Sequence, residues 1–130
     1  MRALVSASGG GALLLCTARA RMQLMRDALD GLGLRVLVHQ SGADLGSLVA
    51  DFRDDPDSVL IASRGAFEGV DVRGESLRLV VLDRLPFPHL DDPIIAALGR
   101  IGRGWGDESL PRAVMAARQA FGRLIRSTDD

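Results

Sequence analysis

Apolar residues gather in four short runs along the chain, and polar positions hardly interrupt any of them. Such runs, rich in Leu, Val and Ile, are typical of strands that are buried on both faces of a parallel sheet. We therefore predict strands over residues 12–17, 34–39, 58–63 and 77–83.

Between the first three runs, apolar residues recur every three or four positions, as they do on one face of a helix. The two sets are Met22, Met25, Leu29 and Leu32, and Leu45, Leu48, Val49 and Phe52. Alternating strands and helices with short connections predict right-handed crossovers. The predicted fold class is therefore a three-layer α/β domain with a mainly parallel sheet, and one domain covers residues 1–130.

The pattern changes after residue 83. Three prolines between residues 86 and 93 predict an extended loop instead of another immediate crossover. A shorter helix is predicted over residues 92–100, followed by a glycine-rich, mobile connection around Trp105. A last helix is predicted from Ser109 to about Arg126, and no apolar run follows it to return a strand to the sheet.

The basic residues narrow the possible chemistry. All 16 are arginines, so the sequence lacks both a Schiff-base lysine and the phosphate-binding lysine of a P-loop. The formal net charge of -1 indicates no global basic field for nucleic acid or membranes. One cysteine, Cys16, excludes an internal disulfide, a zinc finger and a cysteine-ligated iron–sulfur cluster within this chain, and indicates a reducing, cytoplasmic location.

The N-terminal segment has some features of a lipoprotein signal, because Leu13, Leu14 and Leu15 precede Cys16. Polar residues and glycines at 6–11 break the apolar stretch, and Leu15 is too bulky for a processing site. No apolar run approaches the roughly 20 residues of a membrane span. We therefore expect a strand here and no association with a membrane.

Two faces are predicted on the last helix. Leu110, Val114, Ala117, Phe121 and Leu124 form an apolar stripe. Gln119, Arg123 and Arg126 share another face beside Gly122, and this set suits a planar anion such as phosphate. The alternative is a solvated arginine face.

The segment over residues 63–75 directly follows a buried strand and so lies at the carboxyl edge of the sheet, where open α/β folds bind ligands. It combines three glycines with Glu68 and Asp71, although a solvated loop would have the same composition. A metal site of Asp71, Asp83 and His89 is conceivable, but these residues lack a ligand-spacing signature, and we predict none.

In order and spacing, the motifs resemble the second motor domain of superfamily 2 DNA helicases of the XPD/DinG type. Residues 67–75, FEGVDVRGE, resemble motif V, W-E-G-V-D-V-P-G-E. Residues 119–126, QAFGRLIR, resemble motif VI, Q-x-x-G-R-x-I-R, and residues 13–18, LLLCTA, resemble motif IV. The stretch 77–88 and the pair Asp92-Pro93 are also similar to this family.

This resemblance implies a RecA-like domain that lacks the P-loop and closes over ATP and Mg²⁺ held by a first motor domain, in cis or in trans. It implies that Arg123 and Arg126 are arginine fingers on the γ-phosphate and that Gln119 couples the nucleotide state to motion. Gly69 and Asp71 would lie near the nucleotide, and Thr17 and Ser63 would contact single-stranded DNA.

The sequence departs from the family pattern at several positions: Phe67 replaces Trp, Arg73 replaces Pro, Ala18 replaces Ser and Ser63 replaces Thr. Ser63 can still donate a hydrogen bond, whereas Ala18 cannot. We predict the C-terminal motor half of a DinG-type ATP-dependent DNA helicase, inactive as an ATPase by itself. The alternatives are a non-enzymatic helicase-like interaction module, one subunit of a split motor, and a small metal-dependent hydrolase using Glu68, Asp71 and Asp83.

Overall fold

A computed structural model describes residues 1–63, 72, 76–88 and 91–122. All four predicted strands are present in it, and a helix lies in each interval where the periodicity predicts one. The elements in chain order are α1 (Arg2–Ser8), β1 (Ala12–Cys16), α2 (Arg19–Leu29), β2 (Val36–Val38), α3 (Leu45–Asp54), β3 (Val59–Ser63), β4 (Leu79–Leu82), α5 (Pro93–Arg100), the π-helix η2 (Trp105–Ser109) and α6 (Leu110–Phe121).

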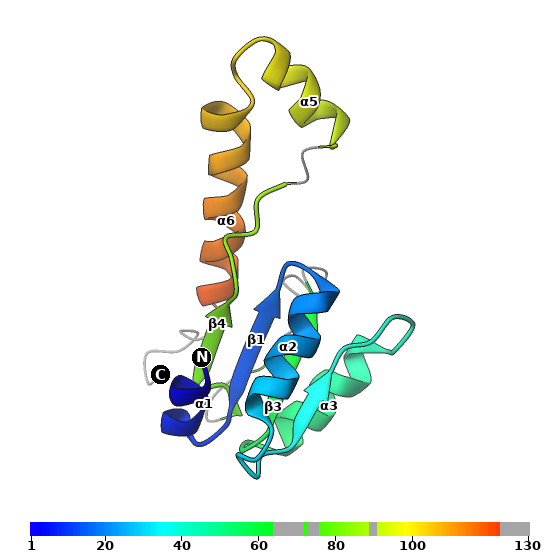
Figure 1. Cartoon of the computed structure of the whole chain (residues 1–130), viewed down its shortest axis with the longest axis vertical. Helices are drawn as coiled ribbons and strands as arrows, with labels where there is room; N and C mark the ends of the chain where they lie inside the picture. Colours follow the sequence, from blue (N-terminus) through cyan, green and yellow to red (C-terminus); the bar gives the residue numbers. More distant parts are fainter. Residues whose placement is uncertain (64–71, 73–75, 89–90, 123–130) are drawn as a thin grey trace.

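The four strands form one parallel sheet in the order β2-β3-β1-β4 (Figure 1). Cys16 of β1 is level with Ser63 of β3, and Leu15 of β1 is level with Leu82 of β4. The carboxyl ends of β1, β3 and β4 therefore meet at one edge of the sheet. This edge lies uppermost in Figure 1.

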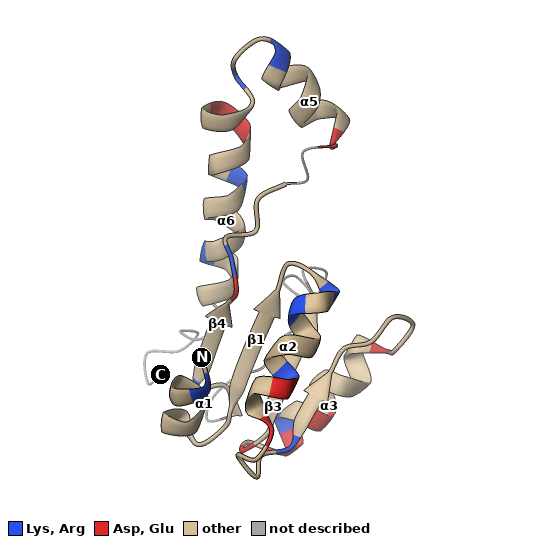
Figure 2. Ribbon diagram, in the orientation of Figure 1, with Lys and Arg blue, Asp and Glu red and all other residues tan. Residues whose placement is uncertain are grey.

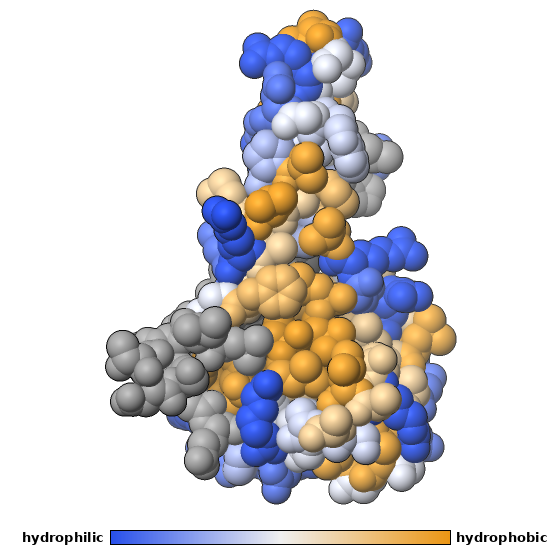
Figure 3. Space-filling view, turned by 90° about the vertical axis from the view of Figure 1, so that its left-hand side faces the viewer, coloured by the Kyte–Doolittle hydropathy of each residue, from blue (hydrophilic) through white to orange (hydrophobic). Residues whose placement is uncertain are grey.

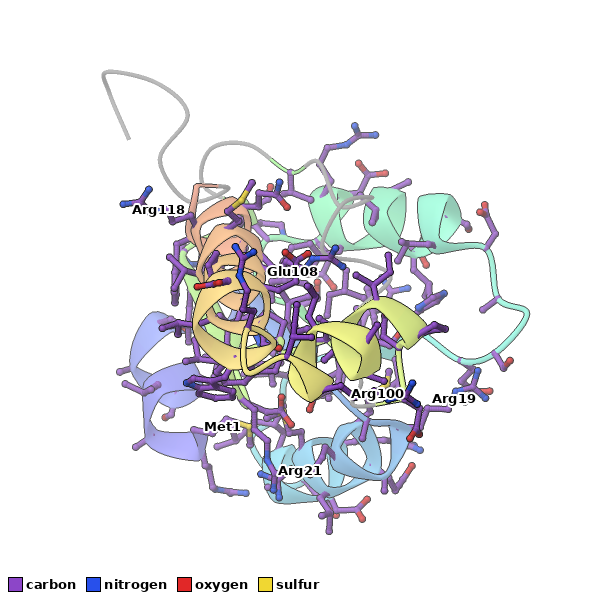
Figure 4. All side chains as sticks on the ribbon, turned by 90° about the horizontal axis from the view of Figure 1, so that it is seen from above. Met1, Arg19, Arg21, Arg100, Glu108 and Arg118 are labelled. Atoms are coloured by element: carbon purple, nitrogen blue, oxygen red, sulfur yellow. The ribbon has the colours of Figure 1, made fainter. Side chains whose placement is uncertain are left out.

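Both faces of the sheet are buried, as the unbroken apolar runs predict. Leu13 and Leu15 point into a core cluster with Phe52 of α3 and Ala120 of α6. The alternate residue Leu14 points into a second cluster with Val5 of α1. Helices α1 and α2 thus cover one face, while α3 and the end of α6 cover the other (Figures 1 and 4). The predicted three-layer α/β architecture is confirmed.

Two helices begin at aspartates that satisfy their first backbone N–H groups. Asp44 accepts hydrogen bonds from the N–H groups of Gly46 and Ser47 at the start of α3. Asp92 does the same for Ile94 and Ile95 at the start of α5. A carboxylate at this position also interacts favourably with the helix dipole.

The sequence analysis did not predict α1. Its seven residues bury only Val5, so it shows no helical periodicity. The turn to β1 runs through three glycines with positive φ, and Gly10 lies so close to Asp57 that a Cβ atom there would be 2.1 Å from the Asp57 carbonyl oxygen. Arg78 fixes this turn by donating hydrogen bonds to the carbonyl oxygens of Ser8 (3.1 Å) and Gly9 (2.9 Å) and to the Asp57 carboxylate (2.9 Å).

Helices α5, η2 and α6 form an arm that extends beyond the carboxyl edge of the sheet and returns to it through the end of α6 (Figure 1). The predicted mobile connection around Trp105 is instead the π-helix η2, and the Trp105 ring stacks on Phe87 with centroids 4.9 Å apart. This contact ties the arm to the proline-rich loop. No helix among the described residues is both long enough and apolar enough to cross a membrane.

The buried face of α6 differs from the predicted apolar stripe. The helix buries Ala113, Ala117 and Ala120, whereas Leu110, Val114 and Phe121 are exposed. Small alanine side chains allow α6 to lie close to its neighbours, so the larger side chains point outward. Figure 3 shows apolar surface on this side of the arm and the sheet. The predicted absence of a strand after the last helix concerns residues 123–130, outside the described part of the chain.

Candidate functional site: the carboxyl edge of the sheet

The two residues predicted to contact DNA lie at the same edge of the sheet. Ser63 ends β3, and its partner in the register with β1 is Cys16. Thr17 directly follows Cys16 in the chain. The Thr17 side chain is exposed, whereas Ser63 is half-buried. The strand order therefore brings together two hydroxyl groups that are 46 positions apart in the sequence (17 to 63).

A buried carboxylate fixes this edge. Asp83 follows β4, and its side chain is 0% exposed. One of its oxygens accepts a hydrogen bond from the backbone N–H of Thr17 at 3.0 Å. The other accepts from the Thr17 hydroxyl at 3.5 Å and from Nε of Arg21 at 3.4 Å. Asp83 thereby ties the end of β4 to the loop that carries Thr17 and to the start of α2.

Cys16 lies beneath this cluster. Its thiol donates a hydrogen bond to the sulfur of Met25 at 3.3 Å. Burial, reinforced by the negative charge of Asp83 and partly offset by Arg21, raises the pKa of the Cys16 thiol to about 11. The thiol is therefore protonated at neutral pH, as expected for an unreactive core residue.

Helix α2 begins next to Thr17 without a side-chain cap, because its N-cap residue is Ala18. The first N–H groups of such a helix are available to other acceptors. Figure 2 shows basic residues, in blue, in the first turns of α2. Figure 4, which looks down on the carboxyl edge, shows Arg19 and Arg21 leaving the helix in different directions. Arg21 turns to Asp83, whereas Nη2 of Arg19 donates to the Ser41 hydroxyl at 2.9 Å.

The last helix returns to the sheet beside β4. Ala120 is buried in the core, and the adjacent Gln119 is exposed near the end of α6. The other residues predicted to contact nucleotide, Gly69, Asp71, Arg123 and Arg126, lie outside the described residues. Val72, next to Asp71 in sequence, is buried in the core cluster between the sheet and α3.

The described residues contain no group of three or more His, Cys, Asp or Glu side chains that could hold a metal ion. Asp83 belongs to both metal-binding sets considered from the sequence, and its carboxylate is occupied by Thr17 and Arg21. Glu68, Asp71 and His89 lie outside the described residues. The geometry around Asp83 therefore favours a structural role for this carboxylate.

Comparison with known proteins identifies the family. The helicase C-terminal domain family matches residues 1–130, the whole chain. This chain belongs to that family. Its relatives include the ATP-dependent DNA helicase YoaA of Escherichia coli strain K12, which is 34% identical over 135 residues. The ATP-dependent helicase DinG of Mycobacterium tuberculosis strain H37Rv is 34% identical over 136 residues, and the 3'-5' exonuclease DinG of Bacillus subtilis strain 168 is 33% identical over 114.

This helicase C-terminal domain is much shorter than these relatives. The match covers 100% of the chain but 21% of YoaA, and 98% of the chain but 20% of the mycobacterial DinG. It covers 83% of the chain and 12% of the Bacillus protein. The predicted XPD/DinG-type resemblance and the RecA-like fold class are confirmed.

Sequence reasoning missed the role of Asp83 and its partner Arg21. A signal was present, because Asp83 ends an apolar run just as Thr17 does, and parallel strands end at the same edge. The contact of the Asp83 carboxylate with the Thr17 N–H group depends on the register of β1 with β4. The hydrophobic pattern of the sequence does not specify that register.

Proposed function

We propose that this domain is the C-terminal motor half of a DinG-type ATP-dependent DNA helicase. The observation that carries the proposal is the meeting of Thr17 and Ser63 at one sheet edge, beside the uncapped start of α2. Hydroxyl groups and free backbone N–H groups suit contacts to a phosphate backbone that do not depend on base sequence. Single-stranded DNA would lie along this edge.

The nucleotide side of the proposal rests on the motif VI residues. Arg123 and Arg126 would reach the γ-phosphate of ATP held, with Mg²⁺, by a first motor domain in cis or in trans. Positive charge placed there stabilises the negative charge that spreads over the transferred phosphoryl group. Gln119, Gly69 and Asp71 would line the same cleft and relate nucleotide state to domain movement. With the phosphate-binding lysine on the partner domain, this chain alone would not hydrolyse ATP.

Binding of a single-stranded oligothymidylate to the chain tests the DNA side. We expect Thr17→Ala and Ser63→Ala each to weaken binding by about tenfold or more, because each loses one hydrogen bond to a charged phosphate. For Thr17, the phosphate would replace Asp83 as the acceptor of the hydroxyl, whose contact with Asp83 is long at 3.5 Å. Ser8→Ala is the matched control, since Ser8 ends α1 at the opposite edge of the sheet and donates only to the Val5 carbonyl oxygen. Equal affinity of all four proteins would contradict the proposed DNA track.

A further inference from the structure

A pocket between α2 and the end of β2 lies outside the motifs discussed above. It has a volume of about 270 Å³. Its described lining residues come from one face of α2 and from the segment that follows β2: Arg19, Met22, Gln23, Arg26, Val38, His39, Gln40 and Ser41. We call it the α2–β2 pocket. Ligand pockets for drug-sized molecules begin at about 300 Å³, so this one suits a smaller group.

The described charged residues that line the pocket are all basic. Two arginines line it, and no acidic residue is among the described lining residues. Several described arginines elsewhere are paired with carboxylates, among them Arg21 with Asp83 at 3.4 Å and Arg35 with Asp51 at 3.3 Å. No described carboxylate pairs with Arg19 or Arg26. An anion that enters the pocket would therefore meet two guanidinium groups without displacing an existing ion pair.

The neutral lining residues add hydrogen-bonding groups and an apolar base. Nη2 of Arg19 donates to the Ser41 hydroxyl at 2.9 Å, and this holds the guanidinium over the end of β2. Nδ1 of His39 is buried and has no hydrogen-bond partner among the described residues. Met22 is only 4% exposed and contributes an apolar side chain to the lining.

We propose that the α2–β2 pocket binds a phosphate group through Arg19 and Arg26, with His39 and Ser41 beside it. The phosphate could belong to a nucleic-acid strand or to a free anion such as inorganic phosphate. In the first case the pocket extends the proposed DNA track from Thr17 toward β2, and only that case rests on the proposed function. Neither Arg19 nor Arg26 belongs to motifs IV, V or VI.

Two titrations of the whole chain test this proposal. In the first, inorganic phosphate is added at constant ionic strength while the ring resonances of His39 are followed by NMR. His89→Gln in the background leaves His39 as the only histidine, because the sequence has two. We expect a saturable shift that is lost in Arg19→Gln and Arg26→Gln. Arg53→Gln is the matched control, since Arg53 is an exposed arginine on α3, on the other face of the sheet.

In the second titration, the affinity for oligothymidylate is measured over a range of salt concentrations. If a strand supplies the phosphate, Arg19→Gln and Arg26→Gln should each weaken binding by about tenfold. Each should also reduce the slope of log affinity against log salt by about 0.7, the value for one lost phosphate contact on a single strand. Arg53→Gln should leave both quantities unchanged.

The outcomes distinguish a nucleic-acid strand from a free anion as the source of the phosphate. They also test the pocket separately from the proposed DNA track. A His39 shift with phosphate, together with unchanged oligothymidylate affinity in the variants, assigns the pocket to a free anion. Lost affinity with a lower salt slope assigns it to a strand. If the wild-type chain binds no oligothymidylate, the proposed DNA track fails while the phosphate titration still decides the pocket. If Arg19→Gln and Arg26→Gln behave as Arg53→Gln does in both titrations, the pocket proposal is wrong.

Discussion

At the scale of single residues, Asp83 organises the edge on which the proposed function depends. Its carboxylate is fully buried and takes hydrogen bonds from one backbone N–H group and from Arg21. A buried carboxylate is stable only when its oxygens are satisfied in this way. The position of Thr17 therefore depends on a residue 66 positions later in the chain.

Substitution of Asp83 should destabilise the domain. Asp83→Ala leaves the Thr17 N–H group without its acceptor, and we expect the free energy of unfolding to fall by roughly 1–3 kcal/mol in urea titrations. Asp83→Asn keeps one oxygen for that N–H group and should lose less. Asp54→Asn is the control: its ion pair with Arg53 spans 4.0 Å and its side chain is 80% exposed, so stability should change by less than about 0.5 kcal/mol. Similar losses in Asp83→Ala and Asp54→Asn would rule out the organising role.

Cys16 gives a pH-dependent signature. Its folded-state pKa of about 11 lies above the ordinary thiol pKa of 9.0, so the unfolded chain releases the thiol proton first as pH rises. Stability should therefore be unaffected by this group below pH 9 and should fall between about pH 9 and pH 11. The chain has no tyrosine and no lysine, so no other side chain normally titrates in this window.

Thermal unfolding between pH 8 and pH 11 measures this effect. The melting temperature of the wild-type chain should fall across the upper part of the range. Cys16→Ala is expected to start lower, because it leaves a small cavity, and to stay nearly flat. A parallel decline in both proteins would show that the thiol is not responsible.

At the scale of elements, the sequence pattern predicted the strands well because β1, β3 and β4 each contain four or five apolar residues in a row, and the shorter β2 contains three. The sequence also predicted α2, α3 and α5, from helical periodicity and from residues that commonly begin or end helices. It missed α1, which buries one side chain, and η2, whose order comes from the stacking of Trp105 on Phe87. Both depend on contacts with distant segments, which local patterns do not encode.

The candidate site shows the same division. The ends of β1 and β3 could be predicted to lie at the same edge, because the carboxyl ends of all strands in a parallel sheet share one edge. The pocket beside Arg19 and His39 could not be predicted, since it depends on how α2 lies across the end of β2. The face of α6 was predicted only in part, because the alanines, not the larger apolar residues, are buried.

The turn between α1 and β1 offers a test at this scale. Gly10 has a φ of +95°, and a Cβ atom there would lie 2.1 Å from the backbone oxygen of Asp57. Gly33 has a φ of +70° with open space around it. Gly33→Ala should cost about 1–2 kcal/mol for its backbone conformation alone. Gly10→Ala should cost about 1–3 kcal/mol more, because the backbone at Asp57, in the turn before β3, must also move.

Denaturant unfolding of the two glycine variants measures this difference directly. Since both substitutions add the same methyl group at a positive φ, their comparison isolates the close approach to Asp57. Equal destabilisation would mean that the turn has room to relax, and that the tight packing of α1 on this edge is not needed for stability.

At the scale of the whole molecule, the amino edge and the carboxyl edge of the sheet differ in the residues they carry. Arg78 and the glycine turn hold the strands together at the amino edge. The carboxyl edge carries Thr17, Ser63, the start of α2 and the end of α6. An arrangement that gathers hydroxyl and basic groups at one edge suits a domain that binds along that edge and closes against a partner.

The proposed role of this domain is to supply arginines to ATP held by another domain. The direct measurement is ATP turnover, with and without single-stranded DNA, by the chain alone and by E. coli YoaA in which this chain replaces the matching segment. We predict no turnover by the chain alone and DNA-stimulated turnover by the chimaera. Arg126→Gln should reduce the latter by about a thousandfold or more, the usual effect of losing an arginine finger.

Arg118→Gln in the same chimaera is the control, because Arg118 is exposed on α6 and lies outside the matched motif positions. Its turnover should equal that of the unmodified chimaera. Turnover by the chain alone, or a chimaera that keeps its full rate with Arg126→Gln, would contradict the proposed role of these arginines.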